Sequence, residues 1–518
     1  MKSISESPWR QTSWSFIIQF CLIFMVLIIG ISFRGLWLEN IPGINGDEAW
    51  YGLQLRASDP IAWHRPTGNI LNPFHMIPLA LFQWIFPDGF LALRLPALLS
   101  QLTFILAGWI LLRKTLGATP ALIFAIVSAG TPHLIAYSRF GWDTSHSALA
   151  TMLIIYFTLE QKWKLMLLTQ CFALIIHPSN IFIVPIWIIY SLWKVYPSGD
   201  KNIKYFWVAL GMLMIISLLL ATILMTNQNF NFIIIEKYQW FTRVLDLRVL
   251  KDLAIKFGEL MSGITIYGYI VGPVSESTRN IHLSIFNFVT IPIITYGCLI
   301  LAIKKDYLPI VFTTGIIAAI FCLYWVSGEL PYRFGYERYR QFLFAPFLVV
   351  FSYCLGNIPS LKKHSINIYI AIIISCAGLL SFWNNYFTPF FQTGGNSFLT
   401  FRTALIEPKK QVFEIMLEKG LLSSKNPIMV TEDWWLTMPL KYLSSKYPAV
   451  KVVGSYEVGN DNLYVQNILE KNGFVVGFIH GIFDELLQKQ RFPFNVERII
   501  IRDYSERPLI IIYHKLPP

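Results

Sequence analysis

Long apolar runs, separated by short polar segments, fill the first three quarters of the chain. The longer runs reach about 20 residues, the length of α-helix that crosses a hydrocarbon core of about 30 Å. The pattern predicts about 11 spans, at residues 14–33, 90–112, 119–137, 145–159, 165–177, 180–194, 205–226, 283–303, 308–327, 341–357 and 366–387. Pro178 interrupts the stretch 165–194, which we interpret as two short helices. The sequence therefore predicts an all-α polytopic membrane domain.

The composition agrees with this pattern. Of the 518 residues, 55% are hydrophobic and 14% are charged, whereas soluble domains carry about 25% charged residues. The formal net charge of +12 would fit a nucleic-acid-binding protein, but the Lys and Arg residues lie in short clusters between apolar runs. That placement is typical of cytoplasmic loops instead. All six cysteines lie in apolar runs, so we expect neither a disulfide framework nor a cysteine metal site.

The basic clusters also predict an orientation, because cytoplasmic loops are enriched in Lys and Arg. With the N-terminus in the cytoplasm, that side receives the clusters at 113–114, 162–164, 194–204, 304–305 and 362–363. The outer side receives the loops 34–89 and 227–282 and the whole tail. The first run, 14–33, is longer than the apolar core of a secretion signal, so we expect a retained anchor.

The chain changes character after residue 387, where short periodic segments replace the long apolar runs. We expect helices at 407–422 and 434–445, and strands at 427–431, 450–453, 473–479, 496–502 and 508–514. This order predicts a small α/β domain. We therefore divide the chain into a transmembrane domain, 1–387, and an extracytoplasmic α/β domain, 388–518.

Two adjacent carboxylates, Asp47 and Glu48, closely follow the first predicted span, and the aromatic Tyr51 comes just after them. An acidic pair in an aqueous loop can simply be solvated, and that interpretation stays open. A carboxylate at a bilayer is costly unless it is solvated or used, and a base that faces a membrane-anchored substrate must lie at this depth. The same outer loop adds three candidate binding residues: His64, Arg65 and His75.

Three stretches in and after this loop carry a resemblance to a known family: NGDEAWYG at 45–52, NPFHMIPLALFQWIFP at 72–87 and LALRLPALLS at 91–100. Their order is similar to that of the glycosyltransferase family 39 and protein O-mannosyltransferase superfamily, which has the GT-C fold and includes aminoarabinose transferases. That family has an Asp-Glu motif in its first outer loop, a proline motif before an interfacial helix, and Arg-Leu-Pro opening its second span. The usual Pro-Pro is Asn72-Pro73 here, a departure from the pattern.

Three further segments resemble the same family. YSRFGWDTSHSALATML at 137–153 has Asp143 where the family often places an acid facing the active site, although Asp143 can also be a helix N-cap. FALIIHPSNIFIVP at 172–185 has His177 in the segment that usually reads Lys-Gly-Pro, and a buried, hydrogen-bonded histidine is the alternative. YERYRQFLFAPFLV at 336–349 resembles the Arg-Tyr segment that opens a late span, although outward arginines can instead bind lipid headgroups.

The resemblance implies a membrane glycosyltransferase that moves a sugar from a polyprenyl-phosphate donor to an acceptor on the outer side, with inversion. We assign Asp47 as general base toward an acceptor hydroxyl or amine, and Glu48 as a catalytic residue that positions the acceptor or the base. Arg338, helped by Arg340 and His177, would hold the donor phosphate. The other expected binding residues are Tyr51, His64, Arg65, His75, Asp143 and Tyr339.

Some features stay open at this point. Oxygen ligands suit magnesium or manganese, so a divalent cation bridging Asp47 and the phosphate is compatible with the sequence but is not required by it. The acceptor is a lipid, a glycan or a protein, and we expect no nucleic-acid partner. We expect the protein in the plasma membrane of a bacterium.

Two other classes of protein stay open. A transporter or flippase of lipid-linked sugars would suit the helix break at Pro178, but the predicted spans carry almost none of the ionisable residues that mark a transport path. A non-catalytic scaffold that displays the tail would leave Asp47, Glu48 and the outer arginines without a role.

Overall fold

The structure is a computed structural model of the chain. It describes residues 13–56, 72–87, 89–194, 210, 247–327, 336–359, 366–396, 399–403, 406–423, 427–458, 462–490 and 492–516. The expected span at 205–226 lies outside the described residues apart from Leu210, and the expected outer loop 227–282 is described from residue 247 onward. The candidate residues His64 and Arg65 also lie outside them.

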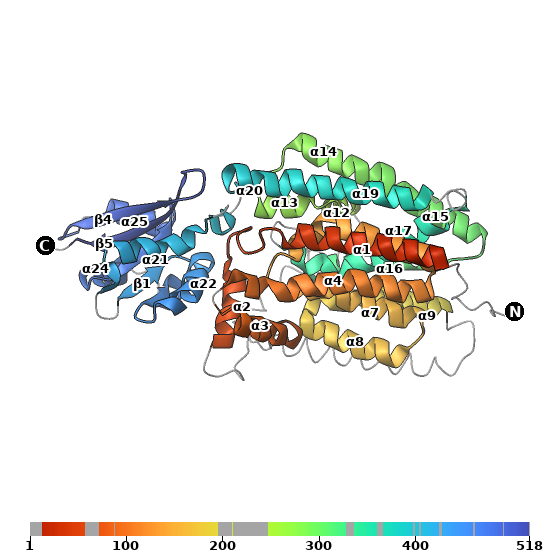
Figure 1. Cartoon of the computed structure of the whole chain (residues 1–518), viewed down its shortest axis with the longest axis horizontal. Coiled ribbons are helices and arrows are strands. Elements are labelled where there is room, and N and C mark those ends of the chain that lie inside the picture. Colours follow the sequence, from red (N-terminus) through yellow and green to blue (C-terminus); the bar gives the residue numbers. More distant parts are fainter. Residues whose placement is uncertain are drawn as a thin grey trace.

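A long helical bundle and a small α/β domain lie end to end (Figure 1). Among the described residues, five helical segments are long and apolar enough to cross a membrane: Phe90–Thr115, Glu276–Ile303, Leu308–Trp325, Glu337–Asn357 and Ile366–Thr393. Shorter apolar helices cover Phe20–Gly35, Ala118–Gly130 and Trp163–Ile176. The protein is therefore an integral membrane protein, while the expected number of about 11 spans goes beyond these five segments.

The helices of the bundle are α1 (Ser13–Gly35), α4 (Phe90–Thr115), α5 (Ala118–Gly130), α6 (Pro132–Tyr137), α7 (Ser147–Leu159), α8 (Trp163–Ile176), α9 (Val184–Lys194), α12 (Leu247–Ser262), α13 (Ile264–Ile270), α14 (Glu276–Ile285), α15 (Ile291–Ile303), α16 (Leu308–Ser327), α17 (Phe344–Asn357), α19 (Ile366–Phe382) and α20 (Thr388–Thr393). Short 3₁₀ turns, η2 (Asp143–His146), η3 (Pro178–Ile183) and η8 (Glu337–Leu343), precede α7, α9 and α17. The domain boundary expected at residue 387 falls within the continuous segment Ile366–Thr393.

The stretch expected as one span at 119–137 is two helices, which corrects that prediction. α5 ends at Gly130 and α6 begins at Pro132, whose nitrogen has no hydrogen to donate to the preceding turn. The break lies against α19, since a Cβ built on Gly130 would lie 2.3 Å from Ser375 Oγ and one on Gly378 would lie 2.1 Å from Gly130 O. The two glycines therefore let these helices pack backbone against backbone.

Two buried arginines fix the place where the chain leaves α1. Arg34 Nη1 and Nη2 donate to Ala129 O at 2.9 Å and Ser128 O at 3.1 Å, near the end of α5. Arg139 donates at 2.7–3.1 Å to four carbonyls at or just beyond the end of α1, those of Phe33, Arg34, Leu36 and Ile41. The last carbonyls of a helix have no intrahelical partner, and a cation there also faces the negative end of the helix dipole. The first outer loop thus starts from a defined position.

The α/β domain contains α21 (Pro408–Glu418), α22 (Trp434–Leu443), α23 (Ser455–Val458), α24 (Asn462–Glu470) and α25 (Ile482–Lys489). Its strands are β1 (Ile428–Thr431), β2 (Lys451–Gly454), β3 (Phe474–Phe478), β4 (Val496–Arg502) and β5 (Pro508–Lys515), in the sheet order β2-β1-β3-β5-β4. β1 pairs in parallel with β2 and β3, whereas β5 pairs antiparallel with β3 and β4. All five strands lie where alternating apolar residues predict them, whereas α24 and α25 were not predicted.

Two short helices of the first outer loop, α2 (Gly46–Arg56) and α3 (Pro73–Ile85), lie between the bundle and the α/β domain (Figure 1). α2 packs against α22, because a Cβ built on Gly52 would lie 2.6 Å from Tyr442 Cε2. Arg56 Nη1 donates to Tyr442 O at 3.1 Å, and its guanidinium lies 4.2 Å from the centre of the Tyr442 ring. The two domains are thus joined through α2.

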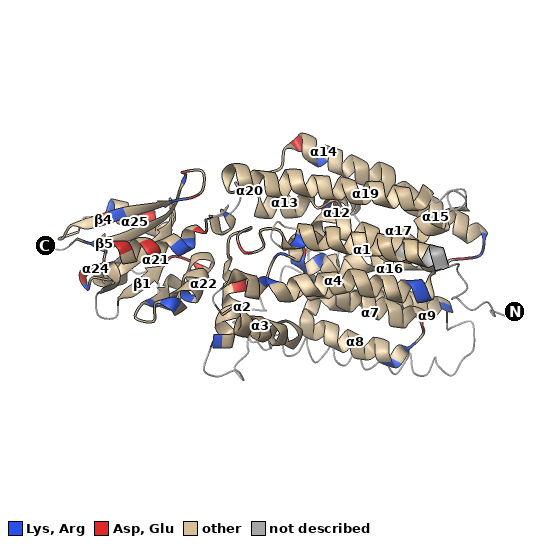
Figure 2. Ribbon diagram, in the orientation of Figure 1, with Lys and Arg blue, Asp and Glu red and all other residues tan. Residues whose placement is uncertain are grey.

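Charged side chains are sparse along the bundle and gather at its ends (Figure 2). Lys and Arg mark the end remote from the α/β domain, where α4, α9 and α15 finish (Figure 2). Acidic residues appear at the opposite end, on α2, which begins with Asp47 and Glu48 in its first turn. The candidate catalytic residues therefore lie at the end of the bundle that meets the α/β domain.

Replacing Arg139 by Met should destabilise the protein by at least about 3 kcal/mol, because four carbonyls lose a charged donor and each such hydrogen bond contributes about 1.5–3 kcal/mol. The measurement is thermal unfolding in detergent, followed by tryptophan fluorescence. Lys304→Met, which removes one exposed positive charge, is the matched control and should leave the midpoint unchanged. Equal midpoints for the two variants would contradict the anchoring role of Arg139.

Candidate active site

The start of α2 is held by a reciprocal cap. Asn45 Oδ1 accepts the backbone N–H groups of Asp47 at 3.1 Å and Glu48 at 3.2 Å. In return, Glu48 Oε2 accepts from Asn45 N at 3.4 Å and from Asn45 Nδ2 at 2.8 Å. This arrangement is a capping box, and both carboxylates lie where the positive end of the helix dipole favours them. The sequence Asn-Gly-Asp-Glu therefore fixes the backbone that carries both acids.

Glu48 is fully buried and paired with an equally buried arginine. Arg94 of α4 donates from Nε to Glu48 Oε1 at 3.0 Å and from Nη2 to Glu48 Oε2 at 3.1 Å. Gly141 N donates to Glu48 Oε1 at 2.7 Å, and Arg94 also donates to Leu38 O at 2.6 Å and Pro42 O at 2.9 Å. A buried ion pair needs such complete hydrogen bonding to offset desolvation. Glu48, expected as the second catalytic acid, is thus fully buried, and together with Arg94 it joins the exit of α1, the start of α2 and the loop before η2.

Asp47 points the other way and is held from two sides. Arg338 Nη1, from η8, lies 2.6 Å from Asp47 Oδ2, and both side chains are 24% exposed. Trp434 Nε1, from α22 of the α/β domain, donates to Asp47 Oδ1 at 3.1 Å. The Arg338 guanidinium also lies 5.3 Å from the ring of Trp142 and 5.4 Å from that of Tyr339, a cation–π arrangement. The acid and the arginine form a partly accessible pair surrounded by aromatic rings.

Asp47 and Arg338 line a cavity of about 230 Å³, which we term the polar pocket. It is lined by Asp47, Trp50, Tyr51, Trp142, Asp143, Thr144, His177, Arg338, Tyr339 and Trp434. The structure therefore brings together six of the expected site residues from four separate segments: Asp47, Tyr51, Asp143, His177, Arg338 and Tyr339. Asp143 is the first residue of η2, whose N-cap is Trp142, so the alternative interpretation of Asp143 as a helix N-cap was wrong.

His177 contributes a ring to the wall of the polar pocket. It stacks on Tyr339 with centroids 5.1 Å apart and an interplanar angle of 23°. His177 Nδ1 accepts from Ser179 N at 3.2 Å and lies 2.7 Å from Ser179 Oγ. An Nδ1 that accepts a backbone N–H places the proton of a neutral imidazole on Nε2. His177 is therefore both hydrogen-bonded at the start of η3 and presented to the pocket.

Two expected residues lie outside the polar pocket. His75 is fully buried, its Nδ1 lies 3.1 Å from His146 Nε2, and its ring packs against Tyr51 at 4.8 Å. Arg340 is buried and donates from Nη1 to Lys256 O at 3.2 Å. His75 therefore supports the pocket wall at Tyr51, whereas Arg340 joins η8 to α12.

Sequence reasoning missed the tryptophans. Trp142 donates from Nε1 to Asn45 Oδ1 at 3.1 Å and so links the pocket wall to the cap of α2. It lies beside Asp143 in a segment that was already singled out, so a signal for it existed. Trp434 lies in the tail, 387 residues from Asp47, and no pattern in the sequence relates the two.

The donor set does not fit a divalent cation. Among the described residues, no group of three or more His, Cys, Asp and Glu side chains is placed to hold a metal ion. Both oxygens of Asp47 accept from Arg338 or Trp434, and a cationic neighbour disfavours a second cation on the same carboxylate.

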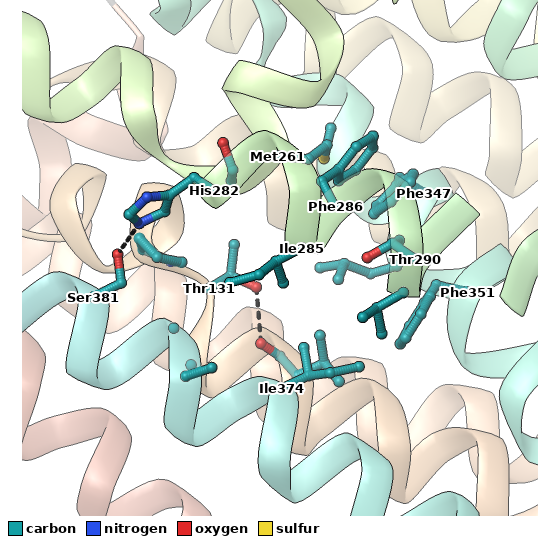
Figure 3. A pocket seen from close by; sticks show the side chains of 18 of the residues that line it. Thr131, Met261, His282, Ile285, Phe286, Thr290, Phe347, Phe351, Ile374 and Ser381 are labelled. Atoms are coloured by element: carbon teal, nitrogen blue, oxygen red, sulfur yellow. Dashed lines mark hydrogen bonds between the residues drawn. The ribbon is translucent and has the colours of Figure 1, made fainter. Parts of the chain in front are cut away.

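A second cavity, of about 390 Å³, lies between α5, α12, α14, α17 and α19 (Figure 3). Its walls are mainly apolar and include Phe286, Phe347 and Ile374. Its polar atoms include the pair His282 Nε2 and Ser381 Oγ, 2.5 Å apart (Figure 3). The predicted site residues that the structure describes all lie outside this cavity, so the polar pocket is the candidate active site.

Comparison with known proteins identifies the fold. No family model and no curated protein sequence matches the chain. ArnT from Cupriavidus metallidurans in the apo state matches with a TM-score of 0.51 at 13% identity, over 96% of this chain and 98% of that chain. ArnT bound to undecaprenyl phosphate matches with a TM-score of 0.50 at 13% identity, over 97% and 98%.

An archaeal structure is also similar. The Archaeoglobus fulgidus oligosaccharyltransferase tethered with an acceptor peptide containing the NVT sequon has a TM-score of 0.50 at 12% identity, over 91% of this chain and 70% of that chain. ArnT and this oligosaccharyltransferase are GT-C fold glycosyltransferases. The likeness shows that this chain has the GT-C fold, as the motifs of its outer loops predict.

Glu48→Gln should destabilise the protein by about 3–5 kcal/mol, because it leaves the Arg94 charge buried without its partner. The double variant Glu48→Gln/Arg94→Met should lose less than the sum of the two single variants, since it removes both charges together. Thermal unfolding in detergent of the four proteins gives this coupling. Strictly additive losses would show that the pair does not act as a unit.

Proposed function

We propose that this protein is a membrane glycosyltransferase that moves a sugar from a polyprenyl-phosphate donor to an acceptor hydroxyl or amine outside the cytoplasm. The observation that carries the proposal is the pairing of Asp47 with Arg338 at the mouth of an aromatic pocket. A base and a phosphate-binding cation side by side are what this transfer requires.

The fold supports the donor class. ArnT, which shares this fold over nearly the whole of both chains, has been solved bound to undecaprenyl phosphate. An oligosaccharyltransferase with the same fold has been solved with an acceptor peptide. We carry both features to this chain as expectations: a lipid-linked sugar enters from the membrane, and an acceptor enters from the aqueous side.

Arg338 is the residue we assign to the donor phosphate. A guanidinium offers five N–H donors in a planar fork that matches phosphate oxygens. In the resting site one of its nitrogens is engaged by Asp47, and the rings of Trp142 and Tyr339 hold its plane. When the phosphate binds, the fork turns toward it and the Asp47 carboxylate becomes available to the acceptor. The two substrates thus share one preformed ion pair.

The bond changes follow from this placement. The acceptor oxygen attacks the anomeric carbon of the donor, and its proton passes to Asp47. The bond from that carbon to the phosphate oxygen breaks, and the polyprenyl phosphate leaves with the electron pair, its charge met by Arg338. Direct attack opposite the leaving group inverts the anomeric centre. An alkoxide leaving group would need a separate acid, as in glycosidases, whereas a phosphate does not.

The remaining pocket residues would bind the two substrates. Asp143, Tyr51, Tyr339 and His177 line the cavity. Glu48 acts as a positioning residue, through the cap of α2. His75 supports the pocket wall at Tyr51, Arg340 joins η8 to α12, and His64 and Arg65 remain candidates on the outer loop.

The topology proposed from the basic clusters is compatible with this site. Lys and Arg lie at both ends of the bundle (Figure 2). The end remote from the α/β domain carries the clusters that close α4 and α9, and we propose that this end is cytoplasmic. We propose residues 388–518 as the limits of the α/β domain. This domain and the polar pocket would then lie outside a bacterial plasma membrane. A transporter or flippase of lipid-linked sugars is the second candidate, favoured by the helix break at Pro178.

Asp47→Asn should lower sugar transfer by at least about 100-fold, since positioned general bases contribute about 10²–10⁴-fold. Its affinity for undecaprenyl phosphate should stay near that of the wild type. The assay uses purified protein in nanodiscs with undecaprenyl-phosphate-linked glucose, mannose and 4-amino-4-deoxyarabinose, and a membrane extract as acceptor. Asp143→Asn, which changes the other pocket acid, should mainly raise the KM.

The same assay separates the candidates. Full activity of Asp47→Asn with loss in Asp143→Asn would move the base to Asp143. If wild type and Asp47→Asn bind undecaprenyl phosphate equally and neither transfers sugar, the result would support the transporter or flippase hypothesis instead. Failure of the wild type to bind undecaprenyl phosphate would refute the donor class.

Arg338→Lys should weaken binding of undecaprenyl phosphate by on the order of 10-fold, because an ammonium keeps the charge but loses the two-pronged geometry. Native mass spectrometry or ligand-induced thermal stabilisation measures the affinity. Arg113→Lys, at the remote end of α4, is the matched control and should bind normally. Unchanged binding by Arg338→Lys would assign the phosphate to other residues.

A further inference from the structure

We infer that Trp434 of the α/β domain is a positioning residue for Asp47, so that the α/β domain completes the active site. The inference rests on the function proposed above, in which Asp47 is the base. It concerns a residue that reaches the site from the tail, through a single hydrogen bond from Trp434 Nε1 to Asp47 Oδ1.

Each oxygen of the Asp47 carboxylate accepts a hydrogen bond from a different donor. Arg338 Nη1 occupies Oδ2 at 2.6 Å, and Trp434 Nε1 occupies Oδ1 at 3.1 Å. Each carboxylate oxygen has two lone pairs, so both oxygens keep one position for an incoming proton. The last torsion of an aspartate side chain is otherwise broad. With a donor at each oxygen, the plane of the carboxylate is set in the resting site, and Trp434 still holds Oδ1 once Arg338 has turned to the donor phosphate.

Trp434 is itself tightly placed. A Cβ built on Gly46 would lie 2.6 Å from Trp434 Cδ1 and 2.8 Å from its Nε1, so the indole lies directly on the first residue of α2. The rings of Trp50 and Tyr456 flank it, with centroids at 6.2 Å and 6.0 Å. Only glycine at position 46 permits this approach. The close packing gives the indole N–H a fixed direction.

The segment that leads into Trp434 is anchored to the sheet. Glu432 accepts the backbone N–H groups of Phe478 at 2.9 Å and Ile482 at 2.7 Å. Asp433 then caps α22, with Oδ1 accepting from Leu436 N at 2.9 Å. Trp434 is the first residue of that helix. The backbone of Trp434 is therefore placed by the α/β domain, and its indole then packs on the first turn of α2.

An indole nitrogen is a donor only, so Trp434 cannot take the acceptor proton. Its contribution is orientation, and catalytic steps are sensitive to the placement of reacting groups. In the part of the chain that the structure describes, Arg338, which we assign to the donor phosphate, is hydrogen-bonded to Asp47 and not to Trp434. Removing the indole N–H should therefore slow turnover and leave donor binding unchanged.

The test replaces Trp434 by 3-benzothienylalanine, an isostere in which sulfur takes the place of the indole N–H. With the undecaprenyl-phosphate-linked sugars described above, we expect kcat to fall about 10-fold, the effect of one hydrogen bond on the reacting group. The KM for the donor should stay within about twofold. The same replacement at Trp435, the next residue of α22, is the control and should leave kcat unchanged.

A double variant with Asp47→Asn separates positioning from structure. In that background the change at position 434 should have no further effect on the residual rate. A kcat within twofold of the wild type for the position-434 isostere, with Asp47→Asn inactive, would overturn this inference and leave the proposed function standing. A rise in donor KM that matches the loss in kcat, or an equal loss in the Asp47→Asn background, would also overturn it. Full activity of Asp47→Asn would instead refute the assignment of Asp47 as the base, the part of the proposed function on which this inference rests.

Discussion

The buried ion pair between Glu48 and Arg94 is the interaction on which the candidate site depends. Two charges withdrawn from water are tolerated only when their hydrogen-bonding groups are satisfied, and here the partners are backbone atoms of Leu38, Pro42 and Gly141 as well as the cap residue Asn45. These partners come from the exit of α1, the start of α2 and the loop before η2. One pair therefore fixes three segments around the first turn of α2.

Asp47, the adjacent acid, shares this fixed backbone but is partly exposed instead of buried. Successive residues of a helix point about 100° apart, so Asp47 faces away from the ion pair while sharing its backbone. Glu48 is fully buried, whereas the side chain of Asp47 is 24% exposed. Two neighbouring carboxylates thus take different roles because of what surrounds them, one holding the helix and one facing the pocket. In the proposed function, the Asp-Glu motif therefore places a candidate reactive residue, Asp47, directly before a structural residue, Glu48.

Local patterns predicted much of this molecule, because helix and strand periodicities act within a few residues of each other. The strands of the tail, the helices at the described predicted spans apart from the break at Pro132, and six pocket residues follow from such patterns and from short motifs. By contrast, α12 and α13 lie in the stretch that was expected to be an outer loop. The sequence could not show which acid faces the pocket. Nor could it pair Asp47 with Arg338, 291 residues away, or with Trp434, 387 residues away, since these contacts exist only once two domains are packed together.

The polar pocket takes its residues from different parts of the molecule, which fits a reaction at the membrane surface. The proposed base lies on α2, the proposed phosphate-binding arginine lies in η8 just before α17, and Trp434 belongs to the α/β domain. In a transport path, ionisable groups would line the inside of the spans, whereas the charges of this bundle gather at its ends (Figure 2). A lipid-linked donor brings its phosphate to the membrane surface, and a water-borne acceptor reaches the same depth from outside. A site assembled from membrane, loop and aqueous parts is placed where those two substrates can meet.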